Sequence, residues 1–170
     1  MNKKKGTWLV IGGAGYIGSH VSRELNKNGI KVIILDNLSL GIKRRVPEDI
    51  ELIVQDCTEI KALNKILIDN KIIGVIHMAA LKQARESIEK PLEYYDTNLS
   101  IMLALLKAMQ NSPVKYMVFS SSCSIYGASS EVTELSEKIP ISPYGMSKLF
   151  CERILEDCAE KLNISFISLR

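Results

Sequence analysis

The stretch Trp8-Leu9-Val10-Ile11-Gly12-Gly13-Ala14-Gly15-Tyr16-Ile17-Gly18 decides the fold. Its apolar first part has the length of a strand, and the spaced glycines after it lead into a helical pattern. Gly12 tolerates a sharp turn, Gly15 lets a ligand approach the backbone, and Gly18 lets the helix pack close to the strand. The start of such a helix suits a pyrophosphate. Because the spacing is G-x-x-G-x-x-G and not G-x-G-x-x-G, the stretch alone also fits an ordinary strand–helix turn.

The rest of the chain alternates short apolar runs with helical patterns, which is typical of a parallel sheet with helices on both faces. We expect strands over 7–11, 31–35, 51–54, 73–78, 116–120 and 164–169. We expect helices from Gly15 to about 28, over 58–70, over 91–111 and over 143–162, and a loop over 79–90. These elements predict a single-domain α/β fold, a doubly wound sheet of order 3-2-1-4-5-6. The chain of 170 residues is long enough for one such domain and short for two.

Three local sequence features refine this expectation: one apolar helix face, one helix stop and one helix start. In the first helix, Ile17, Val21 and Leu25 are four residues apart and should share the buried face. Gly29 is a plausible stop for that helix, and the pair Ser142-Pro143 has the residue types of a helix start.

Composition disfavours several classes of protein. A hydrophobic fraction of 46% and a charged fraction of 24% are ordinary for a soluble globular domain. The net charge of +3 is matched by Lys3-Lys4-Lys5, which we interpret as a solvated tail and not as a nucleic-acid patch. No apolar run has the length of a secretory signal core or a membrane span. The four cysteines have neither C-x-x-C nor zinc spacing, so we expect no metal site and free thiols in the cytoplasm.

Two aspartates follow predicted strands. Asp36 lies about 20 residues past the glycine turn, where a carboxylate can accept hydrogen bonds from both ribose hydroxyls of NAD and would repel the extra phosphate of NADP. It could also simply begin a turn with Asn37. Asp56 is placed to approach the adenine ring or, equally, to cap the helix expected from Thr58.

Tyr144 and Lys148 are four residues apart in a predicted helix and therefore project from one face. A free tyrosine is barely ionised at neutral pH, but a lysine ammonium, the positive helix end and a cationic nicotinamide would each favour the phenolate. Tyr144 could then act as a general base toward an alcohol, with Ser122 after the fifth strand holding the substrate oxygen. Such a pair also arises by chance on surface helices, so this interpretation depends on the glycines and Asp36.

At these positions the chain resembles the extended short-chain dehydrogenase/reductase family and, within it, the UDP-glucose 4-epimerases. The matching stretches are 12–20, 35–39, 75–82, 86–87, 90–95 with Asn98, 119–122, 126–127, 142–145 and 147–148. The glycine motif and Tyr-x-x-x-Lys occur throughout the family, and the stretch 81–95 is the part most similar to the epimerases. Cys123 and Ser124 stand where related dehydratases carry an acidic pair, which argues against a dehydratase.

The resemblance implies a Rossmann-like NAD-binding domain over 1–170, without the C-terminal domain that grips the nucleotide-sugar in longer members. It implies that Tyr144 deprotonates the sugar 4-hydroxyl while C4 gives a hydride to NAD, and that a transient 4-keto sugar takes it back on its other face. Lys148 would hold the nicotinamide ribose, and Ser122 the 4-oxygen. The implied cofactor-binding residues are Gly12, Gly15, Tyr16, Ile17, Gly18, Asp36, Asn37, Asp56, Cys57, Ala79, Ala80 (where members carry glycine), Lys82, Asn98, Ser120, Tyr144 and Lys148.

The implied function is an NAD-dependent UDP-glucose/UDP-galactose 4-epimerase, of which we expect this truncated chain to bind NAD with little or no turnover. A UDP-hexose is the expected substrate, nucleic acid and membranes are not expected partners, and two copies could pair through the helices at 91–111 and 143–162. The alternatives are a non-enzymatic NAD-binding fragment or degraded gene product, and an epimerase of another UDP-sugar. His77 lies in an apolar run and is expected to be a core or backbone-bonding residue, not a catalyst.

Overall fold

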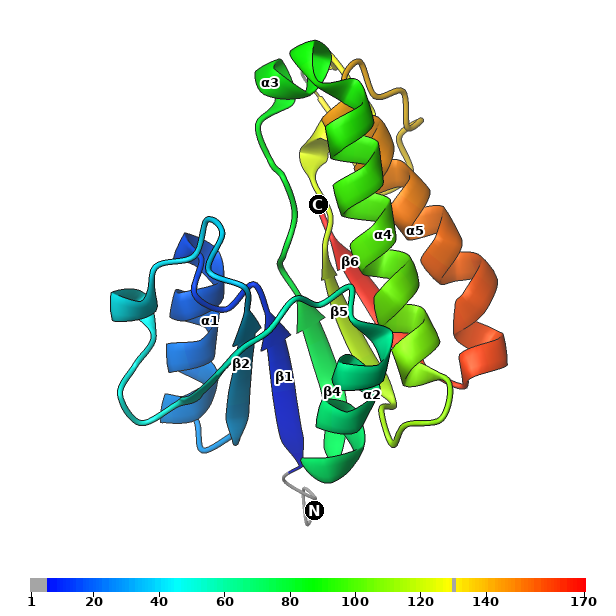
Figure 1. The fold of residues 1–170 in the computed structure, drawn as a ribbon. Coiled ribbons are helices and arrows are strands. Elements are labelled where there is room, and N and C mark those ends of the chain that lie inside the picture. The colour runs from blue at the N-terminus through cyan, green and yellow to red at the C-terminus, as the bar shows by residue number, and fades with distance from the viewer. Residues whose placement is uncertain (1–5, 130) are drawn as a thin grey trace.

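Six parallel strands form one sheet in the order β3-β2-β1-β4-β5-β6 (Figure 1), in a computed structural model that describes residues 6–129 and 131–170. The strands are β1 (Thr7–Ile11), β2 (Val32–Asp36), β3 (Glu51–Val54), β4 (Ile72–His77), β5 (Tyr116–Ser120) and β6 (Ser165–Leu169). The central strands are nearly continuous apolar runs because both faces of a parallel sheet are covered. The strand order and the position of every strand confirm the prediction from the sequence.

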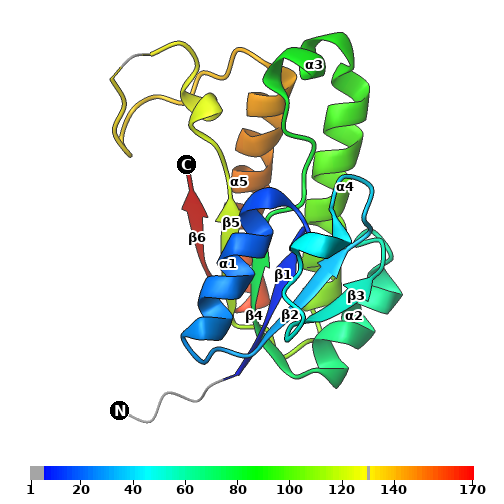
Figure 2. The same ribbon diagram turned by 90° about the vertical axis from the view of Figure 1, so that its left-hand side faces the viewer.

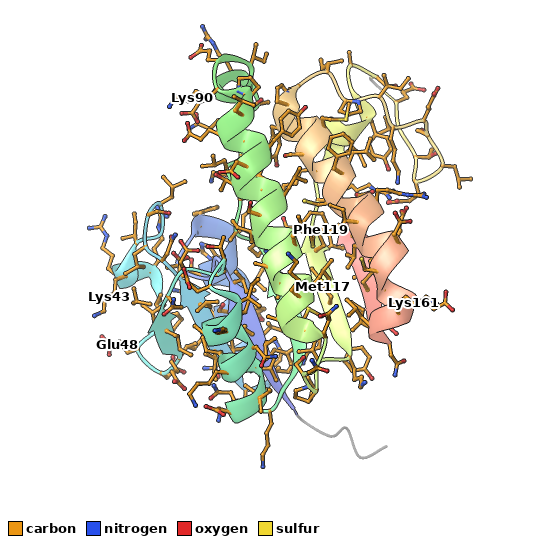
Figure 3. All side chains as sticks on the ribbon, turned by 45° about the vertical axis from the view of Figure 1, so that its right-hand side comes forward. Lys43, Glu48, Lys90, Met117, Phe119 and Lys161 are labelled. Atoms are coloured by element: carbon orange, nitrogen blue, oxygen red, sulfur yellow. The ribbon has the colours of Figure 1, made fainter. Side chains whose placement is uncertain are left out.

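Helices lie on both faces of this sheet. They are α1 (Tyr16–Lys27), α2 (Ile60–Asp69), α3 (Ala84–Glu89), α4 (Pro91–Met109) and α5 (Pro143–Leu162), with short 3-10 turns η1 (Lys43–Arg45) and η2 (Cys123–Tyr126). Figure 2 shows α1 on one face and α2, α4 and α5 on the other. The larger part of the core lies between the sheet and α2, α4 and α5, where Met117 and Phe119 of β5 are buried (Figure 3).

The buried face of α1 differs from the prediction. Ile17 is 57% exposed, while Val21 and Leu25 pack only partly against the core. A Cβ atom on Gly18 would lie 2.3 Å from the carbonyl oxygen of Gly12, so the helix starts too close to the glycine turn for a larger side chain. The residues that α1 buries are small: Gly18, Ser19 and Ser22. The prediction for Ile17 was wrong because close backbone approach decides which face of this helix is buried.

The predicted loop over 79–90 contains the helix α3, so that prediction was wrong for Ala84–Glu89. The helix is tied to its surroundings by buried side chains. The Tyr94 hydroxyl donates to Glu86 Oε2 over 2.7 Å and accepts from the backbone N–H of Gln83 over 3.1 Å. Six residues carry too little periodicity to show as a helix, and these tertiary contacts hold it in place.

The predicted starts of α4 and α5 and the predicted stop of α1 agree with the structure. Pro91 and Pro143 are the first residues of α4 and α5, and the Ser142 hydroxyl accepts from the N–H of Gly145 over 3.1 Å. Gly29 follows α1 with a φ of +73°, in the left-handed region. Within the part of the chain that the structure describes, no helix is long and apolar enough to cross a membrane.

Candidate active site

The glycine turn joins the end of β1 to the start of α1. Gly12 has a φ of +80°, and a Cβ atom there would lie 2.6 Å from the backbone nitrogen of Ala79, so only glycine fits. Gly15 precedes α1 and provides no side-chain cap. The N–H groups of Tyr16 and Ile17 have no hydrogen-bond partner among the described residues. The turn therefore presents free N–H groups at the positive end of a helix dipole.

Asp36 lies beside this turn at the end of β2 and is buried. Its Oδ2 accepts from the N–H of Ala14 over 2.9 Å, and its Oδ1 accepts from the N–H of Leu38 over 2.8 Å. The second bond shows that Asp36 does begin a turn. Each oxygen keeps a free lone pair, so the bonds orient the carboxylate without exhausting it. Gly41, which sequence reasoning missed, allows this approach: a Cβ atom there would lie 2.5 Å from Asp36 Oδ1.

Asp56 reaches the same edge of the sheet from the end of β3. Its Oδ1 accepts from the backbone N–H and the hydroxyl of Thr58 over 2.8 and 2.7 Å, and its Oδ2 accepts from Asn37 over 3.2 Å. The bonds from Thr58 lower the pKa of this carboxyl. Because α2 begins at Ile60, Asp56 does not cap it, and that alternative was wrong. The neighbouring Cys57 is buried, which raises the pKa of its thiol to about 12 and keeps it protonated.

Lys148 is 4% exposed on the inner face of α5. Its ammonium donates to the carbonyl oxygen of Ser120 over 2.8 Å and lies 5.9 Å from the centre of the Tyr144 ring. Burial lowers the pKa of Lys148 to about 8. The predicted pair on one helix face is therefore present, and its lysine is buried at the carboxyl edge of β5 instead of standing in solvent.

Ser122 and Tyr144 are brought to this edge by three contacts. The Ser122 hydroxyl accepts from the N–H of Ser124 over 3.1 Å and so caps η2. A Cβ atom on Gly145 would lie 2.7 Å from the Ser124 carbonyl oxygen, so the start of α5 packs directly on η2. The N–H of Tyr144 donates to the buried Ser87 hydroxyl over 3.1 Å, which ties α5 to α3. Sequence reasoning missed the roles of Gly145 and Ser87.

Asn98 is buried on α4, 3% exposed, and its side-chain amide is fully engaged. Its Oδ1 accepts from the N–H of Leu81 over 2.9 Å, while its Nδ2 donates to the Leu81 carbonyl over 3.1 Å and to the Ser147 hydroxyl over 2.9 Å. Both amide hydrogens are used. Asn98 therefore holds the segment after β4 against α5, whereas the neighbouring Lys82 is exposed to solvent.

Replacing Asn98 with alanine should lower the free energy of unfolding by at least about 2 kcal/mol, because it leaves the N–H and C=O groups of Leu81 without their partners. Urea unfolding measures the change. Ser100→Ala on the same helix is the matched control, since the Ser100 hydroxyl makes only a 3.4 Å contact to Asp96. We expect the control to stay within about 0.5 kcal/mol. Equal losses in the two variants would contradict this role of Asn98.

His77 lies in the core, as predicted, at 2% exposure. Its ring stacks on Phe119 with 5.5 Å between the centres, and its Nδ1 has no hydrogen-bond partner among the described residues. Burial, and then the nearby charge of Lys148, lower the pKa of His77 to about 3. The ring is therefore neutral throughout the physiological range.

Acid should destabilise the fold through His77. Its pKa is about 3 when folded against an ordinary value of 6.5, so the unfolded chain binds more protons between these pH values. Stability is then lost as the pH falls through that window, by about 1.4 kcal/mol per pH unit. We expect the parent to lose about 2 kcal/mol more than His77→Phe between pH 7 and pH 5, measured by urea unfolding. Parallel pH curves for the two proteins would overturn this expectation.

The comparison with known proteins agrees with this arrangement. Residues 8–170 match the NAD dependent epimerase/dehydratase family. The UDP-glucose 4-epimerase of Lactobacillus helveticus is 43% identical over 164 residues, which are 95% of this chain and 50% of that protein. The chain spans about half the length of the curated relatives it matches.

Solved structures share the fold over nearly the whole chain. The UDP-glucose 4-epimerase of Brucella ovis, crystallised with NAD, has a TM-score of 0.93 at 34% identity, over 97% of this chain and 51% of that one. The enzyme of Bifidobacterium longum, crystallised with NAD+ and UDP, has a TM-score of 0.88 at 36% identity, over 96% of this chain and 52% of that one. The glycine turn and the site residues all lie within the matched range, and the chain belongs to the NAD-dependent epimerase/dehydratase family.

Proposed function

We propose that this chain carries the NAD site and the acid–base residues of a UDP-glucose/UDP-galactose 4-epimerase. The observation that carries the proposal is the buried Lys148 beside Tyr144, at the same edge of the sheet as the glycine turn and Asp36. The named relatives support the substrate class, a UDP-hexose. The proposed catalytic residues are Ser122, Tyr144 and Lys148.

The residues at this edge fit NAD. The free N–H groups at the start of α1 suit a pyrophosphate, and the oriented Asp36 carboxylate, with one lone pair left on each oxygen, suits a pair of ribose hydroxyls. Asn98 would act through Leu81 and Ser147, which its amide holds. The proposed cofactor-binding residues are Gly12, Gly15, Tyr16, Ile17, Gly18, Asp36, Asn37, Asp56, Cys57, Ala79, Ala80, Lys82, Asn98, Ser120, Tyr144 and Lys148.

The chemistry assigned to this chain is proton transfer at one sugar hydroxyl. NAD, when bound, would accept a hydride from C4 of the sugar and return it to the same carbon. The Lys148 ammonium stabilises the negative charge of a Tyr144 phenolate, which takes the proton of the 4-hydroxyl and later returns it. The Ser122 hydroxyl, which bonds to Ser124 in this structure, would turn to hold the 4-oxygen. Burial of Lys148 excludes water from its charge and strengthens its effect on the tyrosine.

The proposal also covers the localisation and the assembly of the protein. We place the protein in the cytoplasm, since its four cysteines are free thiols. Two copies would pair through α4 and α5, which pack side by side (Figure 1) and expose Leu103 and Phe150. We propose that the 170 residues are an NAD-binding domain, equivalent to about half of each matched relative.

Calorimetric titration with NAD tests the proposal. We expect binding at pH 7 that weakens above about pH 8, because Lys148 then loses its proton. Lys148→Met should weaken binding about tenfold at pH 7 and remove this pH dependence, since a buried charge-assisted contact is worth about 1.4 kcal/mol or more. Lys161→Met, exposed on the same helix, is the matched control. A folded chain that does not bind NAD at pH 7 would show the proposal to be wrong.

A turnover assay with UDP-galactose tests whether these 170 residues are sufficient for the proposed reaction. We expect NAD binding with little or no turnover from the 170 residues, because the matched relatives are about twice as long. Robust conversion to UDP-glucose would show that these residues suffice. Conversion of a different UDP-sugar in preference to UDP-galactose would correct the substrate and leave the site residues unchanged.

A further inference from the structure

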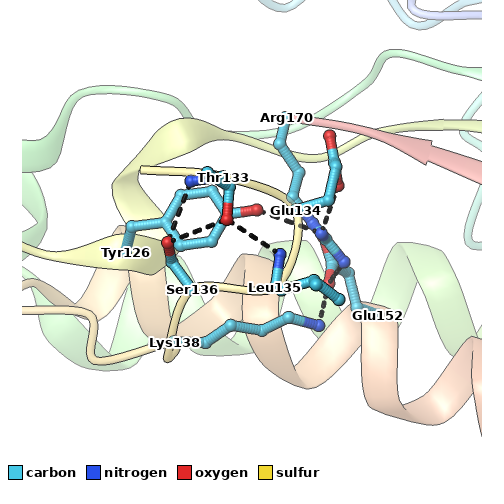
Figure 4. Close-up of polar contacts among 8 residues, drawn as sticks. All are labelled: Tyr126, Thr133, Glu134, Leu135, Ser136, Lys138, Glu152 and Arg170. Carbon is cyan, nitrogen blue, oxygen red and sulfur yellow. Dashed lines mark hydrogen bonds and ion pairs between the residues drawn. The ribbon is translucent and has the colours of Figure 1, made fainter. Parts of the chain in front are cut away.

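Glu152 and Arg170 form an ion pair (Figure 4), and Glu152 lies on α5 four residues, about one helical turn, after Lys148. Glu152 of α5 is 1% exposed, and Arg170 follows β6. The two side chains meet as a fork: Arg170 Nε lies 3.0 Å from Glu152 Oε1, and Nη2 lies 3.0 Å from Oε2. Lys138, from the segment between η2 and α5, adds a third bond to Oε2 over 3.0 Å. Both oxygens of Glu152 are therefore occupied by cations from outside its own helix.

Arg170 has further partners that fix its position. Its Nη1 donates to the Tyr126 hydroxyl over 3.0 Å and to Glu134 Oε2 over 2.7 Å. The guanidinium also lies 5.8 Å from the centre of the Tyr126 ring. Burial acts to raise the pKa of Glu152, but Arg170, followed by Ser121 and Lys138, outweighs it, and the pKa is lowered. Glu152 is therefore a buried carboxylate that is ionised and fully neutralised.

Lys148 and Glu152 stand at the spacing that normally forms an ion pair on a helix. In this structure they form none: the Lys148 ammonium bonds to the Ser120 carbonyl instead. The groups that face the ammonium are Tyr144 and Cys151 on α5, His77 on β4, and Phe119 and Ser120 on β5. None of these is a carboxylate, and His77 is neutral. The charge of Lys148 is therefore left free to act at Tyr144.

We propose that Arg170 is a positioning residue for Lys148: by occupying both oxygens of Glu152, it keeps this buried carboxylate from pairing with the lysine one turn earlier on α5. The role of Lys148 itself rests on the proposed function. Without Arg170, Glu152 would keep Lys138 as its one cationic partner, and a buried carboxylate that loses a partner is driven toward the nearest available cation. That cation is Lys148. Pairing would pull the ammonium from Ser120 and hold its charge at Glu152, away from Tyr144.

The first test needs no ligand. NMR titration of lysine-labelled protein follows the Lys148 ammonium, whose pKa is about 8 in the parent. In Arg170→Gln we expect this pKa to rise, because a carboxylate now faces the ammonium. In the double variant Arg170→Gln/Glu152→Gln it should return to the parent value, although Arg170 is still missing. An unchanged titration in Arg170→Gln would overturn the proposal. Arg170→Lys, which keeps one cation at Glu152, gives a milder variant if Arg170→Gln does not fold.

The second test is a double-mutant cycle on NAD affinity, measured by calorimetry on folded protein. We expect Arg170→Gln to weaken NAD binding about tenfold when Lys148 is present, and less than about twofold in the Lys148→Met background. A merely structural role for Arg170 would give the same factor in both backgrounds, and that result would overturn the proposal. If the parent protein does not bind NAD, the proposed function fails, while the ligand-free titration still decides whether Arg170 keeps Glu152 from Lys148.

Discussion

Replacing Tyr144 with phenylalanine should lower the turnover of UDP-galactose by about 10²- to 10⁴-fold, the usual contribution of a general acid–base residue. The change removes only the hydroxyl. The ring stays beside Lys148, and the backbone bond from Tyr144 to Ser87 is unaffected, so the fold and the position of α5 should not change. NAD affinity should therefore change far less than turnover. The turnover rate is measured in a catalytically active protein that contains these 170 residues, and NAD binding is titrated in parallel.

The matched control is Tyr95→Phe on α4. Tyr95 is half-buried, packs on the Phe150 ring with 6.2 Å between the centres, and lies outside the proposed site. Its loss of a hydroxyl should leave turnover within about twofold of the parent. Similar small losses in both variants would mean that Tyr144 is not the proton acceptor.

Replacing Gly18 with valine should have the largest effect on folding. The new Cβ atom would lie 2.3 Å from the Gly12 carbonyl oxygen and 2.8 Å from the Cα atom of Gly13. Both are backbone atoms, so relief requires α1 to move away from the turn. We expect the free energy of unfolding to fall by about 3 kcal/mol and NAD binding to be lost, because the N–H groups of α1 move with the helix. Urea unfolding and NAD titration measure the two effects.

Gly15→Ala separates close packing from ligand approach. A Cβ atom on Gly15 would meet only the Gly12 carbonyl oxygen, at 3.1 Å, and Gly15 has an ordinary extended backbone with a φ of −70°. Folding should therefore change by less than about 1 kcal/mol. NAD binding should still weaken, since the added methyl group would stand where we propose that NAD passes the backbone. A variant Gly18→Val that folds and binds NAD like the parent would refute the close-packing explanation.

Local sequence patterns predict the strand order because short apolar runs alternate with helical patterns, which is typical of a parallel doubly wound sheet. The same patterns mislead where backbone contact overrides side-chain hydrophobicity. On α1 the apolar Ile17 is exposed, while Gly18 and Ser22 are buried and Gly18 lies directly against the glycine turn. The six residues of α3 are too few to show a helical pattern. The helix depends on Tyr94 of α4, whose hydroxyl bonds to Gln83, and on its own Ser87, which bonds to Tyr144 of α5.

In the candidate site, too, the sequence predicts local relations between residues and does not predict long-range contacts. Tyr144 and Lys148 are found from their spacing on one helix, and Asp36 from its distance to the glycines, because both relations are local. The contacts that hold these groups join distant parts of the chain. Glu152 lies on α5 and bonds to Arg170, which follows β6, and no sequence pattern near Glu152 identifies Arg170 as its partner.

The segment after β4 has a consequence for motion. Asn98 binds it at Leu81, Tyr94 binds it at Gln83, and Ser87 binds its far end to the first turn of α5. The segment is thus fastened to α4 and α5 at several points, which favours a fixed wall over a moving lid beside the proposed site. Deuterium uptake at the amides of Leu81, Gln83 and Tyr144 should accordingly be slow and correlated, and would report the rare openings of this wall as one unit.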